Sequence, residues 1–167
     1  MPIIDAQVHC YERNHPGRPW QAVLAGPPEV TGDQMVATMD AADVDGAILI
    51  SPITMYRYDA RYALEVHKRH PNRFALIKPV DPTDPAVADI IADWKRTPGT
   101  VGVRMLLVRG GYTEDPDDPG LNHVIATAGR LSLSRDSIRD RPGPRYSRRA
   151  PAACARRPCR ACASSRR

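Results

Sequence analysis

Short apolar runs and helical spacings alternate along the first 133 residues of the chain. The apolar runs predict buried strands over residues 2–9, 47–50, 74–77 and 101–108. Between them, apolar residues recur three and four positions apart, which predicts helices over residues 31–42, 60–67, 87–94 and 121–128. Thr31 and Gln34 have the spacing of a capping box, so the first helix is expected to begin there.

Strict alternation of strands and helices is typical of parallel strands joined by right-handed crossovers. Two architectures fit, the first half of a (β/α)8 barrel and a small open, doubly wound sheet. No glycine-rich phosphate loop follows the first strand, which weakens the dinucleotide-binding form of the second architecture. The predicted fold class is therefore α/β, a partial (β/α)8 TIM barrel of about four βα units, since a whole barrel takes about 250 residues.

The pattern fails after Leu133. Residues 134–167 contain one strongly apolar aliphatic residue, Ile138, and are rich in Arg, Pro, Ala, Ser and Cys. Residues 1–129 carry a net charge of −5 and residues 130–167 a net charge of +10, which together give the +5 of the whole chain. We predict a half-barrel domain over residues 1–133 and a disordered basic tail over residues 134–167, although residues 130–133 could open a fifth strand.

The composition of this tail also suggests its origin and its partners. Arg, Ala, Pro and Gly have GC-rich codons, so we hypothesise that a frameshift produced it. Its arginines could attract phosphates, and a small α/β domain with a basic nucleic-acid-binding tail is the alternative function. Aromatic residues that would stack on bases are missing there apart from Tyr146, which makes a nucleic-acid partner unfavoured. A small open α/β domain with a regulatory or binding role is a third reading.

Membranes are not predicted partners. No apolar run approaches the roughly 18 residues that a membrane span needs, and no signal-peptide pattern opens the chain, so a cytoplasmic location is expected. A half barrel would leave sheet edges uncovered, and self-association through those edges is the expected protein contact.

Candidate chemistry begins at the end of the first predicted strand, where Asp5, Gln7 and His9 occupy alternate positions. Side chains at alternate positions of a strand point to one side, and a barrel carries its active site at the carboxyl ends of its strands. We predict catalytic roles for Asp5 and His9, with His9 also a metal ligand and Gln7 a substrate-binding residue. Asp5 equally fits a turn cap or an arginine partner.

Polar residues also follow the later strands. Arg104 is expected to end the fourth strand and to hold a substrate carboxylate through a bidentate pair, a catalytic role. Outside a barrel it would be an ordinary ion-pairing residue. Ser51 and Tyr56 follow the second strand and are expected to hydrogen-bond a substrate, and Lys78 ends the third and is expected to neutralise an anion.

In these motifs the chain resembles the amidohydrolase-related metal-dependent hydrolases, which have the (β/α)8 barrel fold. The resemblance covers residues 1–133 and rests on Asp5-Ala-Gln7-Val-His9, supported in order by residues 18–20, 46–50, 73–82 and 101–104. The family's first strand usually ends His-x-His, and both histidines bind a divalent metal. Here Gln7 takes the first position, so only His9 matches, and glutamine is a poor ligand for zinc.

The resemblance implies an activity and a limit to it. Branches with such a glutamine are similar to lactone hydrolases or decarboxylase-like enzymes, which implies a small carboxylated or lactone-like substrate and leaves zinc in question as the cofactor. The family's remaining ligands and its catalytic aspartate lie on strands five to eight. We therefore expect the chain to be truncated and to show no significant hydrolase activity by itself.

Overall fold

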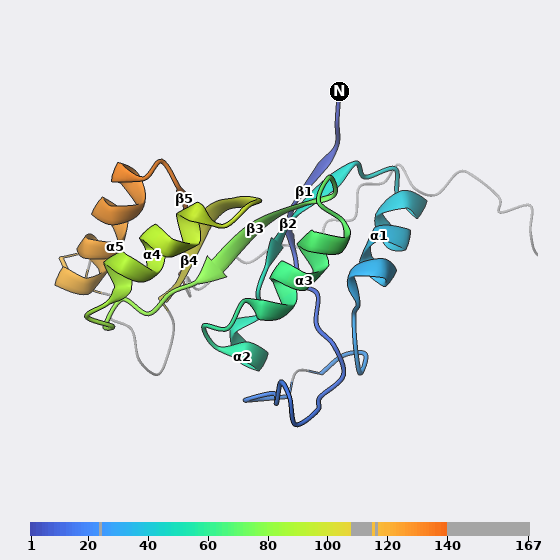
Figure 1. Cartoon of the computed structure of the whole chain (residues 1–167), viewed down its shortest axis with the longest axis horizontal. Coiled ribbons are helices and arrows are strands. Elements are labelled where there is room, and N and C mark those ends of the chain that lie inside the picture. Colours follow the sequence, from blue (N-terminus) through green and yellow to red (C-terminus); the bar gives the residue numbers. More distant parts are fainter. Residues whose placement is uncertain (24, 108–114, 116, 140–167) are drawn as a thin grey trace, which may run out of the picture.

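The computed structural model describes residues 1–23, 25–107, 115 and 117–139, and within them five strands alternate with helices (Figure 1). The elements in chain order are β1 (Ile4–Val8), α1 (Gly32–Ala41), β2 (Gly46–Ile50), α2 (Ile53–Tyr56), α3 (Arg61–Arg69), β3 (Phe74–Pro79), α4 (Val87–Arg96), β4 (Thr100–Leu107), α5 (Pro119–Arg130) and β5 (Ser134–Arg139). The alternation predicted from the apolar pattern is therefore present, with the short helix α2 as an addition that the pattern did not indicate.

The order of the strands decides between the two predicted architectures. All five strands form one parallel sheet, and their order in the sheet, β1-β2-β3-β4-β5, is their order in the sequence. A doubly wound sheet reverses its strand order at a switch point, whereas a barrel adds each strand beside the previous one. The described residues therefore have the arrangement of a partial (β/α)8 barrel.

The hydrophobic core lies between one face of this sheet and the helices. Figure 1 shows α3, α4 and α5 along that face, and α4 and α5 contact each other. Alternate strand residues point into this layer, and adjacent strands place them side by side, as Leu49 and Leu76 do. The core takes strand residues and helix residues that are almost fully buried, among them Leu49, Leu76, Val103, Val66, Ile91 and Val124.

The first strand is more exposed than the sequence indicated. We predicted a buried strand, but β1 pairs only with β2 in the described chain, and Ile4 is 55% exposed. Val8 is the one buried residue of β1. The pairing also slips between Asp5 and Val8, where β1 advances three residues while β2 advances two. Such a bulge bends the edge strand and breaks the simple alternation of its side chains.

Local signals fix where the helices begin. The predicted capping box is present, because the Thr31 hydroxyl accepts from the Gln34 backbone N–H at 3.2 Å and the Gln34 side chain accepts from the Thr31 N–H at 2.8 Å. Helix α5 begins behind Asp118, whose carboxylate accepts from Leu121, with proline in the first turn. None of the helices in the described ranges is long and apolar enough to cross a bilayer.

The first six residues of the predicted tail lie in a strand, β5. Residues 130–133 do not open a strand; Arg130 ends α5, and Ser132 adopts a positive φ of 54° in the turn that follows. Strand β5 then pairs in parallel with β4, from Gly102 beside Ser134 to Leu107 beside Arg139. Backbone pairing at a sheet edge needs no apolar period, so the hydrophobic pattern could not find this strand. Residues 140–167 of the predicted disordered tail lie outside the described residues.

Two valines on β4 allow a matched test of the core. Val103 is fully buried and Val101, two residues earlier on the same strand, is 37% exposed. Val103→Ala is expected to lower the free energy of unfolding by about 2 kcal/mol, from two lost methyl groups at about 0.8 kcal/mol each and a cavity. Val101→Ala should cost less than half as much. Urea unfolding followed by circular dichroism measures both, and equal losses would contradict the described burial.

Candidate active site

Three of the predicted polar residues form a hydrogen-bonded row on the face of the sheet opposite the helices. Arg104 on β4 donates from Nη2 to Oε1 of Gln7 at 3.3 Å. The Gln7 amide nitrogen lies 3.3 Å from Nε2 of His9, and Nδ1 of His9 lies 2.7 Å from the carbonyl oxygen of Ile50. Side chains from β4 and from the end of β1 are therefore connected to one backbone carbonyl of β2.

This contact also reports on the shape of the sheet. Two strands, β2 and β3, lie between β1 and β4. Adjacent strands are about 4.8 Å apart, so on a flat sheet the two backbones would be separated by about 14 Å. Gln7 and Arg104 nevertheless touch. Their side chains reach across a concave face, which is the inside of a barrel.

The row has a fixed direction, because its two ends can act in only one way. A guanidinium only donates and a backbone carbonyl only accepts. Gln7 must therefore accept with Oε1 and present its amide N–H groups to Nε2 of His9. Nε2 then accepts, and the proton of a neutral imidazole lies on Nδ1, which donates to Ile50. We assign this tautomer from the network of contacts.

Burial differs strongly along the row. Gln7 is exposed and His9 is half-buried, whereas Arg104 is only 3% exposed. The predicted place of Arg104 at the end of its strand is wrong, since β4 continues to Leu107 and Arg104 lies in its middle. Pro79 on β3 and Asp136 on β5 hold the neighbouring register positions. The guanidinium is therefore much less accessible to solvent than the amide of Gln7 that it contacts.

Asp5 does not join this row in the contacts described. Its carboxylate accepts from the backbone N–H of Gln7 at 2.9 Å, a local turn within the bulge of β1. Asp5 is exposed. The turn-capping alternative thus describes its observed contact, while its catalytic role stays a prediction.

Ser51 and Tyr56, the substrate-binding residues predicted after β2, form hydrogen bonds with backbone groups. Ser51 is buried, and its hydroxyl donates to the carbonyl oxygen of Asp59 at 2.6 Å. The hydroxyl of Tyr56, also buried, accepts from the backbone N–H of Glu12 at 3.1 Å. Burial raises the pKa of Tyr56. Both residues contact the chain rather than the row, and substrate binding by them stays a prediction.

Lys78 lies on the other face of the sheet from the row. It occupies the register position beside Val103, a core residue that faces the helices. Its ammonium group lies 5.9 Å from the ring centre of Trp94 on α4. The sequence grouped Lys78 with Arg104, but one residue of register separates their positions and places them on opposite faces.

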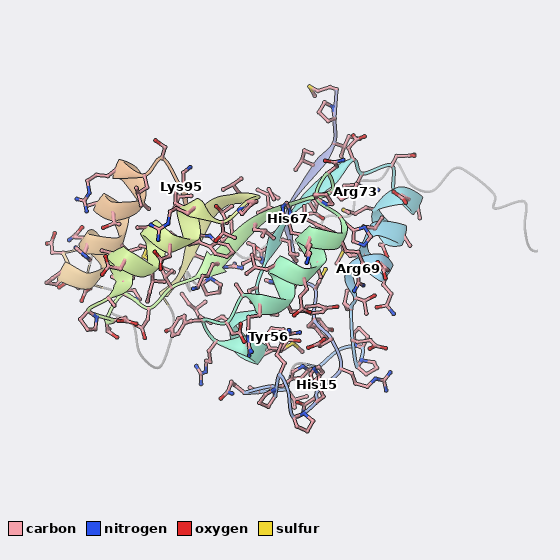
Figure 2. The ribbon with its side chains drawn as sticks, viewed as in Figure 1. His15, Tyr56, His67, Arg69, Arg73 and Lys95 are labelled. Atoms are coloured by element: carbon pink, nitrogen blue, oxygen red, sulfur yellow. The ribbon has the colours of Figure 1, made fainter. Side chains whose placement is uncertain are left out.

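A network that sequence reasoning did not single out holds the connection between β1 and α1. Glu12 accepts from Nε2 of His15 at 2.7 Å and from Arg18, and Arg18 also bonds Glu65 on α3. The guanidinium of Arg18 lies 5.2 Å over the ring of Tyr62. Figure 2 shows His15 and Tyr56 at the same end of the molecule, away from Arg73. The closely spaced charges in this proline-rich stretch were the available signal.

The donor atoms of the row do not make a metal site by themselves. His9 offers one imidazole nitrogen, and the described contact directs an amide N–H of Gln7 toward it. No group of three His, Cys, Asp or Glu side chains that could hold a metal occurs within residues 1–23, 25–107, 115 and 117–139. His9 therefore stays the single predicted ligand, and a complete zinc shell would need donors from elsewhere.

Comparison with known proteins shows which family and which fold the chain matches. The model of the amidohydrolase family matches residues 4–158. A probable 2-pyrone-4,6-dicarboxylic acid hydrolase from Acinetobacter baumannii, solved with citric acid bound, has 19% identity and a TM-score of 0.66 over 82% of this chain and 49% of that chain.

Two further solved structures are described with metals. An amidohydrolase from Burkholderia multivorans with bound zinc has 18% identity and a TM-score of 0.60 over 81% of this chain and 48% of that chain. A 5-carboxyvanillate decarboxylase from Novosphingobium aromaticivorans, complexed with manganese and a nitrobenzoic acid ligand, has 16% identity and a TM-score of 0.56 over 80% of this chain and 49% of that chain.

These structural similarities establish the fold of the matched part of this chain. The chain spans about half the length of the solved structures it matches. No curated protein matches its sequence.

The residue after His9 gives a testable pH dependence. Cys10 is buried, and burial raises the pKa of its thiol from 9.0 to about 12. The folded state therefore favours the neutral thiol, a contribution that is fully present below pH 9 and is lost as pH rises toward 12. By pH 10 the free energy of unfolding should fall by about 1.4 kcal/mol from this group.

Urea unfolding of the wild type and of Cys10→Ala between pH 7 and pH 10 measures this contribution. Below pH 8 the two proteins should show parallel pH profiles, and above pH 9 the variant should lose less stability. Identical slopes above pH 9 would contradict the burial of the thiol.

Proposed function

Because this chain belongs to the amidohydrolase family, we propose that it carries the carboxylate-binding part of a site that hydrolyses or decarboxylates a small carboxylated or lactone-like substrate. One observation supports this most directly. A nearly buried guanidinium, that of Arg104, holds the amide oxygen of an exposed glutamine, Gln7, on the concave face of the sheet. The proposal is that this amide oxygen occupies the position of a substrate carboxylate oxygen.

Physical chemistry favours such an exchange. A carboxylate bonds a guanidinium through charge-assisted hydrogen bonds, which are roughly twice as strong as bonds between neutral partners. The contact between Gln7 and Arg104 is long, at 3.3 Å, and the glutamine side chain is exposed. A carboxylate arriving from solvent can therefore replace the amide oxygen, and the low exposure of Arg104 strengthens the new pair.

His9 supplies the group that moves a proton. With its proton on Nδ1 and bonded to Ile50, its Nε2 is the basic nitrogen and lies on the side of Gln7. In a hydrolysis, Nε2 would accept a proton from water attacking a lactone carbonyl. In a decarboxylation, a protonated Nε2 would return a proton to the carbon that loses carbon dioxide.

The names of similar proteins agree with this substrate class. The Acinetobacter protein is described as a probable dicarboxylic acid hydrolase with citric acid bound, and the Novosphingobium protein as a carboxyvanillate decarboxylase. Both names contain a carboxylated substrate. One similar structure is described with zinc and another with manganese. If this chain binds a metal, His9 would be its ligand.

Binding of citrate tests the proposed exchange. Citrate is expected to bind the wild-type chain in isothermal titration calorimetry at fixed ionic strength. Gln7→Ala removes the competing amide and should bind citrate as tightly as the wild type or more tightly. Gln7→Glu places a carboxylate beside Arg104 and should weaken binding at least tenfold, because the internal pair competes with the ligand.

Matched controls separate this exchange from general charge effects. Arg69→Met removes an exposed arginine of α3 and should leave citrate binding unchanged. Gln7→Glu changes an exposed side chain, so circular dichroism should show an intact fold. Equal citrate affinity in Gln7→Glu and the wild type would overturn the proposed role of Arg104.

Turnover by the 167-residue chain is a separate question. The resemblance to the family places further ligands and an aspartate on later strands, so we expect no significant conversion of 2-pyrone-4,6-dicarboxylate or 5-carboxyvanillate by this chain. The assay follows the ultraviolet absorbance of each compound with and without added Zn²⁺ or Mn²⁺. Robust, metal-stimulated turnover that is lost in His9→Asn would contradict this expectation and would support catalysis by His9.

A further inference from the structure

A cavity lies on the helix side of the sheet, away from the row that contains His9. Its volume is about 320 Å³, and α3, α4 and β3 supply its walls. This volume is at the lower end of the range for small-molecule sites, roughly 300–1,000 Å³. Its apolar walls are Leu64, Ile90 and Trp94, and its charged groups are Lys78, Arg61, Asp59 and Asp93.

The aromatic wall of this cavity is held in place. The indole N–H of Trp94 donates to the carbonyl oxygen of Gly102 at 2.9 Å, which fixes the ring against β4. Lys78 extends from β3 toward this ring, with its ammonium group 5.9 Å from the ring centre. The cavity therefore holds a positive charge beside a fixed aromatic ring that is only 4% exposed, and both come from secondary-structure elements rather than from loops.

The charges around the cavity are unevenly paired. Asp59 bonds Arg61 at 2.7 Å, and Asp93 bonds Arg96. Within the described residues, the ammonium group of Lys78 forms no hydrogen bond and no contact ion pair. Burial lowers the pKa of Lys78, and the charges of Asp59 and Asp93 oppose that effect. Lys78 is thus half-buried with no contact ion pair, and the two carboxylates act on it only from a distance.

We propose that this cavity binds a small organic carboxylate, whose charged group pairs with Lys78 and whose apolar body packs against Leu64 and Ile90. A half-buried ammonium gains most from an anion that replaces its lost water. The apolar walls select an acid with a hydrocarbon or aromatic body over an inorganic anion such as chloride. The site lies wholly within the described residues and is independent of the function proposed for Arg104.

Benzoate is a suitable probe, because it combines a carboxylate with a flat ring. Titration of the ¹⁵N-labelled full chain should shift the indole N–H signal of Trp94 and leave that of Trp20 unchanged. Lys78→Met should weaken benzoate binding at least tenfold, whereas Lys78→Arg should retain it within a few fold. Lys95→Met removes an exposed lysine of α4 (Figure 2) and should bind like the wild type.

Benzamide separates charge from apolar burial without any substitution. It has the shape of benzoate but no charge, and it should bind at least tenfold more weakly to the wild type. This comparison remains decisive if Lys78→Met fails to fold. Equal binding of benzamide and benzoate, or benzoate affinity that survives Lys78→Met in a folded protein, would overturn the proposal.

Discussion

Parallel pairing of each strand with the next one in sequence is the constraint on which this protein depends. Each crossover must bring the chain back to the end of the sheet where the strands begin, and it does so over the same face. Helices α3, α4 and α5 therefore gather on that face, and the core forms there. The other face receives no helix in the described chain. Polar side chains can therefore occupy this face without being buried in the apolar layer under the helices. Gln7, His9 and Arg104 do so.

The hydrogen-bonded row follows from this division of faces. Arg104 is nearly buried yet charged, which is tolerated only with suitable acceptors around it. Its guanidinium orients the amide of Gln7, and that amide faces Nε2 of His9. The carbonyl oxygen of Ile50 holds the other ring nitrogen, Nδ1. Each member has a single role because the ends of the row permit one direction. These contacts fix the orientation of all three side chains in the chain without a ligand.

The sequence predicted the elements better than the site, and register explains the difference. Apolar periods identify which residues are buried, so the strands, the helices and the cap at Thr31 could be predicted. Lys78 and Arg104 both belong to apolar strands, and a period cannot say which face each one takes. Pairing with Val103 and Pro79 decides it. The bulge of β1 and the pairing of β5 are likewise backbone events with no apolar signature.

The loop after β1 has a further consequence, which concerns how the chain could be rebuilt. Tyr11 and Val30 exchange two backbone hydrogen bonds of 2.8 Å, so the ends of the intervening segment are already joined. Closing a loop costs conformational entropy, and here the two hydrogen bonds between its ends offset that cost. The chain therefore leaves and returns at one junction, and the segment between is anchored a second time, by Arg18 to Glu65 on α3. A loop grafted between the paired residues would keep the junction but would need its own cation for Glu65.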